Sequence, residues 1–206
     1  MSGTPYISSD DSALLRGALR GRSGGTCLEI GAGNGGNLVE LAKGFETTAG
    51  TDVTRPSMRD WTESSDMVLA DRAGCFRDGV FDLVALNPPY LAGGGTGDLA
   101  VDGGPGLEVP LAFLEEALRV VRKDGRVVLL LNQEADLGVF EEACGRRGFG
   151  LRRVSSVRLF FEVLSVYEAA PADGHPHSRS PSEGARSGHS ETSTARRLHQ
   201  VPASPS

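Results

Sequence analysis

The feature that most constrains the fold is a strand that runs directly into a glycine-rich loop. Residues 26–33 read TCLEIGAG, and the following NGG leads into residues 37–43, whose pattern predicts a helix. Gly31, Gly33 and Gly35 have the spacing G-x-G-x-G. Glycine permits the sharp turn between strand and helix and lets a ligand approach the backbone closely. The segment therefore predicts a ligand-binding turn, with a tight turn carrying surface acids as its plain alternative.

Strand and helix patterns alternate on both sides of this loop. Further strands are expected at residues 47–53, 66–71, 81–87 and 125–133, and further helices at 11–19, 58–63, 109–122 and 136–147. Two last strands, near 151–161 and 161–169, are expected to pair antiparallel at the sheet edge. Strands separated by helices imply right-handed βαβ units. The predicted fold class is α/β: a Rossmann-like, doubly wound, seven-stranded and mostly parallel sheet with an antiparallel C-terminal strand.

Composition changes sharply near Pro171, which predicts a folded domain over residues 1–170 and a tail over 171–206. The tail is nearly free of large apolar residues, so it is expected to be disordered. All four histidines lie in it, which excludes a Ser-His-Asp hydrolase or a histidine-ligated metal site in the domain. No apolar run approaches the roughly 20 residues that cross a bilayer, and the first residues lack a signal-peptide pattern. We expect a cytoplasmic protein without membrane attachment.

Acidic residues accompany the glycine loop. Glu29 precedes the glycines, and Asp52 ends the next predicted strand. A carboxylate at the second place can accept hydrogen bonds from a ribose diol. Gly36 also completes the spacing G-x-G-x-x-G, so a nicotinamide dinucleotide is not excluded. Glu29 fits a cationic sulfonium with an amino-acid tail better, because the charges are complementary.

The strand predicted at 81–87 stops at Asn87, Pro88, Pro89 and Tyr90. Neither proline can donate a backbone hydrogen bond, so no strand or helix passes through them. The side-chain oxygen of Asn87 and the carbonyl of Pro88 can accept both hydrogens of a planar NH2 group, and Tyr90 can stack on it. Such a site acts through alignment and electrostatics and needs no ionising residue. The plain alternative is a turn that ends the strand.

The segments LEIGAGNGG, TDV, VLAD and NPPY, in this order, resemble the class I S-adenosylmethionine-dependent methyltransferases. The resemblance implies that S-adenosyl-L-methionine is the cofactor, with Asp52 on its ribose and Asp71 on the adenine amino group. Asp71 as a helix cap or loop acid is the alternative. The site residues that it implies are a cofactor-binding set (Ser12, Glu29, Gly31, Gly33, Asp52, Asp71 and Asn87), a substrate-binding set (Asn87, Pro88, Pro89 and Tyr90) and a catalytic set (Asn87, Pro88 and Tyr90).

Two further segments resemble one branch of that superfamily. DGGPGLE, at 102–108, is similar to a segment of the glutamine methyltransferases that act on peptide chain release factors. PYISSDDSALLRGAL is similar to the N-terminal segment of their archaeal and eukaryotic branch, although Ser8 replaces its proline. The branch implies the Gly-Gly-Gln amide of a release factor as acceptor. It also implies a small zinc-binding activator subunit, docked on the strand within SDMVLADRAGCF. Ser12 is either a cofactor contact or a helix cap.

Two other functions stay open from the sequence. A nucleic-acid amino methyltransferase, acting on adenine N6 or guanine N2, is suggested by a group of arginines that can equally form a solvated face (Arg146, Arg147, Arg152, Arg153 and Arg158). The net charge of −6 speaks against a duplex substrate. A non-catalytic cofactor-binding module is the third possibility, and the intact Asn87 and Tyr90 speak against it. The cysteines, Cys27, Cys75 and Cys144, are expected to be small buried residues.

Overall fold

The computed structural model describes residues 10–54, 65–89, 107–160 and 162–172. Within these ranges the elements in chain order are α1 (Asp10–Leu19), β1 (Gly24–Ile30), α2 (Gly36–Leu41), β2 (Phe45–Asp52), β3 (Asp66–Leu69), β4 (Phe81–Leu86), α3 (Glu108–Val120), β5 (Val121–Asn132), α4 (Leu137–Arg146), β6 (Phe149–Arg158) and β7 (Val163–Pro171). The predicted helix at 58–63, Tyr90, most of the glycine-rich loop after it and the predicted tail from residue 173 lie outside the described residues.

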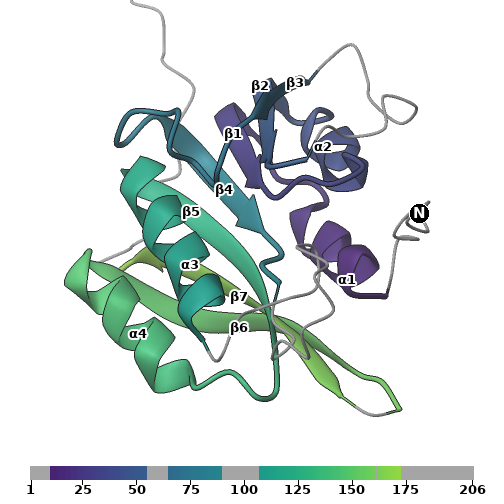
Figure 1. Ribbon diagram of the computed structural model, residues 1–206, viewed down its shortest axis with the longest axis vertical. Coiled ribbons are helices and arrows are strands. Elements are labelled where there is room, and N and C mark those ends of the chain that lie inside the picture. Colours follow the sequence, from purple (N-terminus) through teal and green to yellow (C-terminus); the bar gives the residue numbers. More distant parts are fainter. Residues whose placement is uncertain (1–9, 55–64, 90–106, 161, 173–206) are drawn as a thin grey trace, which may run out of the picture. The chain divides into compact units, whose positions relative to one another are not determined.

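The strands form one sheet in the order β3-β2-β1-β4-β5-β7-β6 (Figure 1). Strands β1 to β5 pair in parallel, whereas β7 runs antiparallel between β5 and β6. The predicted fold class is confirmed. The chain builds outward from β1 to β3 and then returns to place β4 on the other side of β1. In open α/β sheets such a switch point, at the carboxyl ends of the strands, is where ligands bind.

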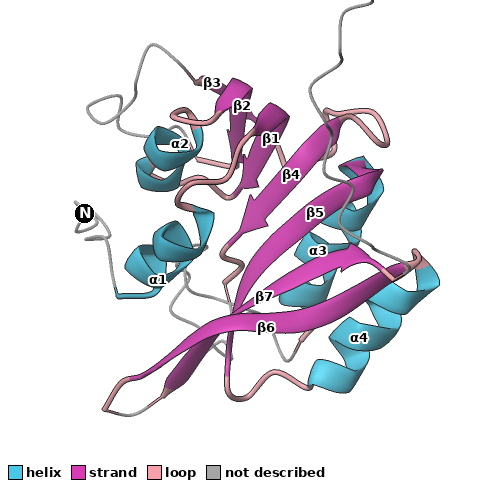
Figure 2. Ribbon diagram, turned by 180° about the vertical axis from the view of Figure 1, so that it is seen from behind, coloured by secondary structure: helices cyan, strands magenta, loops and turns pink. Residues whose placement is uncertain are grey.

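Helices cover both faces of the sheet, as the front and back views show (Figures 1 and 2). Alternate side chains of a strand point to opposite faces, so neighbouring residues of β4 enter different cores. Val84 packs in the core that contains Leu114 of α3 and Phe140 of α4. Leu83 packs in the other core, with Leu15 of α1. None of the described helices combines the length and the apolar character that a membrane span needs.

The boundary between α3 and β5 differs from the prediction. α3 ends at Val120 and β5 begins at Val121, whereas the pattern predicted a helix to 122 and a strand from 125. Val121 already pairs with Phe81 of β4, and a register shift accommodates the Lys-Asp-Gly segment that follows. The sequence pattern predicted that these polar residues end a helix, but they form an irregularity within a strand.

The cysteines also depart in part from the prediction. Cys27 and Cys144 are buried, but Cys75 is exposed in the segment between β3 and β4, so the prediction was wrong for Cys75. Burial raises the pKa of the Cys27 and Cys144 thiols to about 11. Both therefore stay protonated at neutral pH and pack as small apolar side chains.

Candidate active site

Predicted site residues lie at the carboxyl ends of adjacent strands. β1, β2 and β4 end level with one another, because Ile30 pairs with both Thr51 and Leu86. Asp52 at the end of β2 pairs in turn with Leu69 of β3. The glycine loop follows β1 directly, and Asn87 follows β4. The structure thus brings one group of predicted residues to the switch point of the sheet, namely Glu29, Gly31, Gly33, Asp52 and Asn87.

The glycine loop folds over the end of β2. The backbone N–H of Gly31 donates to the carbonyl of Thr51 at 2.9 Å, and that of Gly33 donates to Oδ2 of Asp52 at 2.9 Å. Both glycines have positive φ, 74° and 52°, which other residues rarely adopt. Oδ1 of Asp52 accepts from the backbone and hydroxyl of Thr54 at 2.8 and 2.7 Å. Because each carboxylate oxygen offers two acceptor positions, Oδ2 keeps one for a ligand hydroxyl.

The Glu29 carboxylate is buried beneath this loop, with 3% of the residue exposed. Its Oε1 accepts from Nδ2 of Asn37 at 2.7 Å, and its Oε2 has no hydrogen-bond partner in the described part of the chain. Burial raises the pKa of Glu29 from its ordinary value of 4.5 to about 8, against the hydrogen bond from Asn37 and the positive charge of Arg16. The free protein therefore holds this carboxyl largely protonated at neutral pH, and a neighbouring cation would ionise it.

Asn87 is held in one orientation at the end of β4. Its Nδ2 donates to Oδ2 of Asp11 at 3.3 Å, while its Oδ1 is buried and has no hydrogen-bond partner among the described residues. Because Asp11 engages the donor side of the amide, the oxygen is the side left to accept a hydrogen bond. Pro88 is buried and Pro89 is partly buried. The prediction for Tyr90 falls outside the described residues.

Four further polar residues at this edge were missed by the sequence analysis. Atoms of Arg16 (Nε), Asn37 (Oδ1) and Thr51 (Oγ1) are buried without a hydrogen-bond partner in the described ranges. Asp11 lies inside α1, and its Oδ2 accepts a hydrogen bond from Nδ2 of Asn87. The position of Asn37 directly after the glycines was an available signal. No spacing in the sequence points to Arg16 or Thr51.

Two predicted cofactor contacts, Ser12 and Asp71, have other hydrogen-bond partners. Ser12 is the third residue of α1, so it is not the helix cap, and its backbone N–H donates to Oδ1 of Asp11 at 2.8 Å. Asp71 lies beyond the end of β3, as expected from the sequence, with 68% of its side chain exposed. It pairs with the neighbouring Arg72 at 3.0 Å. Among the described residues, neither side chain forms a hydrogen bond with Glu29, Asp52 or Asn87, and both assignments stay predictions.

Unpartnered polar atoms concentrate at this edge of the sheet. Among the described residues, six buried side-chain atoms lack a hydrogen-bond partner, and five belong to Arg16, Glu29, Asn37, Thr51 and Asn87. A buried polar group left without a partner costs roughly 1–3 kcal/mol. Such a concentration at a switch point is typical of a site that a ligand completes. Because the group includes a guanidinium and a carboxyl, the ligand would carry both signs of charge or several polar groups.

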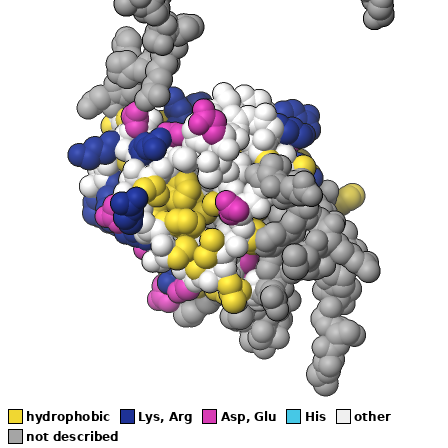
Figure 3. All heavy atoms as spheres, turned by 90° about the horizontal axis from the view of Figure 1, so that it is seen from above, with side chains coloured by type: hydrophobic (Ala, Val, Ile, Leu, Met, Phe, Trp, Pro, Cys, Tyr) yellow, Lys and Arg dark blue, Asp and Glu magenta, His cyan; other side chains and the backbone are white. Residues whose placement is uncertain are grey.

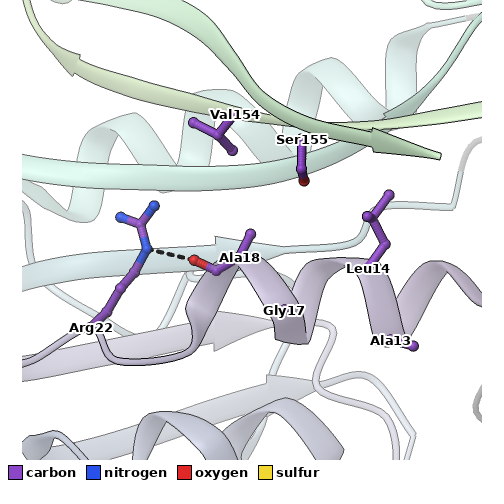
Figure 4. Close-up of a pocket in the computed structure, with 7 residues that line it drawn as sticks. All are labelled: Ala13, Leu14, Gly17, Ala18, Arg22, Val154 and Ser155. Atoms are coloured by element: carbon purple, nitrogen blue, oxygen red, sulfur yellow. Dashed lines mark hydrogen bonds between the residues drawn. The ribbon is translucent and has the colours of Figure 1, made fainter.

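A groove of about 430 Å³ lies elsewhere, between α1 and β6 (Figure 4). It is lined by Ala13, Leu14, Gly17, Ala18, Arg22, Val154 and Ser155. Arg22 is its one charged lining residue, and this guanidinium is occupied. Its Nε donates to the carbonyl of Ala18 at 2.8 Å, and it pairs with the buried Glu168 at 2.6 Å. The charged side chain of the groove is thus engaged within the protein, whereas Oγ of Ser155 is buried without a hydrogen-bond partner among the described residues.

Three of the five arginines that suggested a nucleic-acid substrate form ion pairs with acidic side chains. Arg146 pairs with Glu115 at 2.8 Å and Glu142 at 3.0 Å, and Arg152 pairs with Glu168 at 2.6 Å. In the view of Figure 3, basic and acidic side chains are interspersed around a central group of hydrophobic ones. Among the described residues this face presents no uniformly basic area for a phosphate backbone.

No protein-family model and no curated protein sequence matches the chain. Solved structures match its fold. The E. cuniculi Mtq2–Trm112 complex, responsible for methylation of the eRF1 translation termination factor, has a chain with 24% identity and a TM-score of 0.67, covering 81% of this chain and 98% of that chain. The T. thermophilus 16S rRNA N2 G1207 methyltransferase RsmC, solved with AdoMet and guanosine, has 20% identity and a TM-score of 0.60, and the match covers 82% of this chain and 44% of that chain. The Synechocystis magnesium protoporphyrin IX methyltransferase ChlM, solved with SAM, has 15% identity and a TM-score of 0.55, and the match covers 84% of this chain and 87% of that chain. The chain thus has the fold of S-adenosylmethionine-dependent methyltransferases.

Proposed function

We propose that this protein is an S-adenosyl-L-methionine-dependent N-methyltransferase that acts on the glutamine side-chain amide in the Gly-Gly-Gln segment of a peptide chain release factor. The observation that carries the proposal is the orientation of Asn87. Its oxygen is buried and unpartnered within the described chain, and Asp11 occupies its nitrogen. An acceptor fixed at the end of β4 suits a planar NH2 group, which presents its two hydrogens in one plane.

The residues at the switch point fit S-adenosyl-L-methionine, which would supply an electrophilic methyl group when bound. Arg16 carries a positive charge and Glu29 can be ionised by a neighbouring cation, and each has an unpartnered atom, which suits the amino-acid end of that molecule. Asp52 keeps an acceptor position for the ribose. Two of the structural neighbours were solved with this molecule bound, which supports the same donor here.

Asn87 and Pro88 would orient the acceptor. Oδ1 of Asn87 takes one hydrogen of the substrate NH2 group, and the carbonyl of Pro88 takes the other. Because Pro89 follows, ψ of Pro88 is restricted as well as its φ, so the Pro88 carbonyl has little conformational freedom to lose on binding. The two acceptors draw the nitrogen toward tetrahedral geometry and direct its lone pair. No general base is needed before transfer, because the surplus proton leaves afterwards to water.

The edge strand β3 would hold a small zinc-binding activator of the Trm112 kind. β3 is the last strand on its side of the sheet, so its outer backbone groups have no strand partner within the described chain. Leu69 of β3 is 68% exposed, and Val53 beside it is 53% exposed. An unpaired edge with exposed apolar side chains suits the addition of a strand from a partner. The E. cuniculi neighbour was solved as a complex with Trm112, which supports this proposal.

A labelled-methyl assay tests the function. The protein is incubated, with and without an activator, with methyl-labelled S-adenosyl-L-methionine and either release factor or RNA, and each product is then treated with nuclease. We expect label in the release factor that survives nuclease, and none when the Gly-Gly-Gln glutamine is replaced by alanine. Label in RNA would overturn the glutamine proposal in favour of a nucleic-acid amino methyltransferase. A protein that binds the donor but labels neither acceptor would be a non-catalytic module.

A further inference from the structure

The groove between α1 and β6 contains a glycine that the fold itself does not require (Figure 4). Gly17 lies within α1, and glycine is among the least favourable residues inside a helix. A Cβ at this position would meet nothing within 4 Å among the described residues, and the φ of Gly17 is not positive. Neither crowding nor backbone conformation therefore demands glycine here. The open space above Gly17 is available to a molecule that enters the groove.

The opposite wall of the groove carries an unsatisfied hydroxyl group. Oγ of Ser155 is buried without a hydrogen-bond partner among the described residues, and the side chain points from β6 toward α1 (Figure 4). The pairing of β6 with β7 shifts its register between Arg153 and Ser155, and Val154 at this bulge also lines the groove. Bulges re-aim side chains and are frequent beside active sites. A buried hydroxyl in this position suits a hydrogen bond to a bound molecule.

One end of the groove has an excess of positive charge. Arg22, which lines the groove, pairs with the buried Glu168 at 2.6 Å. Arg126 and Arg152 pair with the same carboxylate at 3.3 and 2.6 Å. Three guanidinium groups thus share one carboxylate, and no other acidic side chain pairs with them in the described part of the chain. Because 65% of the Arg152 side chain is exposed, it can bind a further acidic group at this end.

The helix α1 connects the groove to the candidate active site. Asp11, in the first turn of α1, accepts a hydrogen bond from Nδ2 of Asn87, and the groove begins two residues later at Ala13. From Asp11 to Ala18 the helix rises about 10 Å, a distance that about three residues of extended polypeptide cover. When Asn87 holds a glutamine that is part of a polypeptide, the residues next to that glutamine are therefore within reach of the groove.

We propose that the groove between α1 and β6 binds the polypeptide segment that flanks the acceptor glutamine, with an acidic residue of that segment at the Arg22 end. The proposal rests on the function proposed above and assigns a docking surface to the same substrate. The apolar lining of the groove suits side chains of the segment, and Oγ of Ser155 can hydrogen-bond to its backbone. The groove would thus select one glutamine by the residues around it.

Steady-state methylation of the release factor by variants of the full chain tests this. We expect Gly17→Leu to raise KM for the release factor by about tenfold or more and to keep kcat within about twofold, because leucine fills the space of the segment. Ser155→Ala should raise KM by about three- to tenfold through the loss of one hydrogen bond. Arg152→Gln should raise KM by about twofold and weaken its dependence on salt. The affinity for S-adenosylhomocysteine should not change in any of them.

Gly145→Leu is the matched control. Gly145 lies in α4 on the other face of the sheet, and a Cβ there also meets nothing within 4 Å among the described residues. This variant should have the KM of the wild type. An unchanged KM for Gly17→Leu would overturn the proposal, as would an equal rise in KM for Gly145→Leu. Wild-type KM and salt dependence for Arg152→Gln would overturn the acidic contact.

Thermal melts show whether each variant is folded. If Gly17→Leu is not, Ser155→Ala decides alone: a raised KM with unchanged affinity for S-adenosylhomocysteine supports the docking surface, and an unchanged KM overturns it. A wild-type protein that transfers no methyl group to the release factor would instead overturn the function on which the proposal rests.

Discussion

The two ends of the sheet differ in whether their polar side chains have hydrogen-bond partners. At the amino end, Oδ2 of Asp82 accepts from the backbone N–H groups of Gly25 and Thr26 at 2.9 and 2.8 Å, and Oδ1 accepts from Arg122. At the carboxyl end, Glu29 and Asn87 each keep a buried oxygen without a partner in the described chain. The first arrangement stabilises the fold, whereas the second costs stability until a ligand arrives. The difference supports the carboxyl end as the candidate binding end, without reference to any motif.

Arg119 follows the same rule at the amino end. Its guanidinium donates to Asp78 at 2.7 Å, to Glu116 at 2.8 Å and to the carbonyls of Ala73 and Phe76, both at 2.9 Å. This cation is fully engaged by the protein, unlike Arg16 at the opposite end. Two arginines of one chain thus differ in whether the fold itself satisfies them. Substitutions at the amino end should therefore act on stability, and those at the carboxyl end on binding and catalysis.

The largest effect is expected for Asn87→Ala. Loss of Oδ1 of Asn87, the oriented hydrogen-bond acceptor, should lower kcat for methyl transfer by about 10²–10³. This is the range seen when one preorganised hydrogen-bonding group is removed. Affinity for S-adenosylhomocysteine should stay within about threefold of the wild type. The reason is that Asn87 is proposed mainly to orient the methyl acceptor and less to bind the methyl donor. Labelled-methyl kinetics and calorimetry check the two halves. A fully active variant would refute the role given to Asn87.

The opposite result is expected for Asp82→Ala. The substitution leaves two backbone N–H groups and Arg122 without their acceptor, so the free energy of unfolding should fall by about 1–3 kcal/mol. Affinity for S-adenosylhomocysteine should not change, because Asp82 lies at the far end of the sheet. Urea denaturation and calorimetry measure the two quantities. Weaker ligand binding in a variant of unchanged stability would break the contrast between the ends.

The pH dependence of Glu29 should separate binding from stability. Its pKa is about 8 in the folded protein and 4.5 when unperturbed, so between these values the folded protein keeps a proton that the unfolded chain has lost. The contribution of Glu29 to the free energy of unfolding therefore falls as pH rises through this window, by up to about 1.4 kcal/mol per unit. Affinity for S-adenosylhomocysteine should rise over the same window by up to about tenfold per unit, because its ammonium favours ionised Glu29.

Glu29→Gln is the control for this prediction. It keeps an oxygen that can accept from Asn37 but cannot ionise, so both pH dependences should flatten. The charged groups that act on Glu29, Arg16 and Asp52, remain in this variant. Calorimetry at pH 6, 7 and 8, together with urea denaturation at each pH, gives both curves. Identical pH profiles for the wild type and the variant would show that Glu29 is not the titrating group.

The smallest effect is expected for Asp11→Ala. Without the carboxylate that accepts from Nδ2, the amide of Asn87 can rotate and present either its oxygen or its nitrogen to the substrate. We expect kcat to fall by about tenfold, less than for Asn87→Ala, since the acceptor oxygen is still present part of the time. Asp11→Asn, which has the same shape and keeps an oxygen that can accept a hydrogen bond but carries no charge, should recover part of the rate. No change in kcat would mean that other contacts orient Asn87.

Residues within one strand-and-loop unit were predictable, because strand ends and glycines mark them. Glu29 lies in the strand that leads into the glycine loop, Asp52 ends the next strand and Asn87 follows β4, and parallel pairing brings such strand ends together. Contacts between distant segments were not predictable. Asp11 and Asn87 lie 76 positions apart and meet because α1 packs across the sheet. Periodicity tells which side of α1 is apolar, but not which polar side chain at its border reaches the site.

Prediction from the sequence also fails where a local pattern competes with tertiary packing. The predicted end of α3 relied on the helical repeat and on a Lys-Asp-Gly break, but Val121 already pairs with Phe81 in β5. Pairing across the sheet outweighed the local helical preference. Exposure is equally hard to read: Cys75 is exposed, although its residue type favours burial. Both are decided by tertiary packing, which a single sequence does not contain.

The most direct test of the account is a crystal structure of the protein soaked with S-adenosylhomocysteine. We predict that the molecule lies at the carboxyl end of the sheet, with its sulfur toward Asn87 and its amino-acid end between Arg16 and Glu29. The buried atoms that now lack partners should then be hydrogen-bonded to it. Density for the ligand in the groove between α1 and β6, or no density at saturating concentration, would contradict the account.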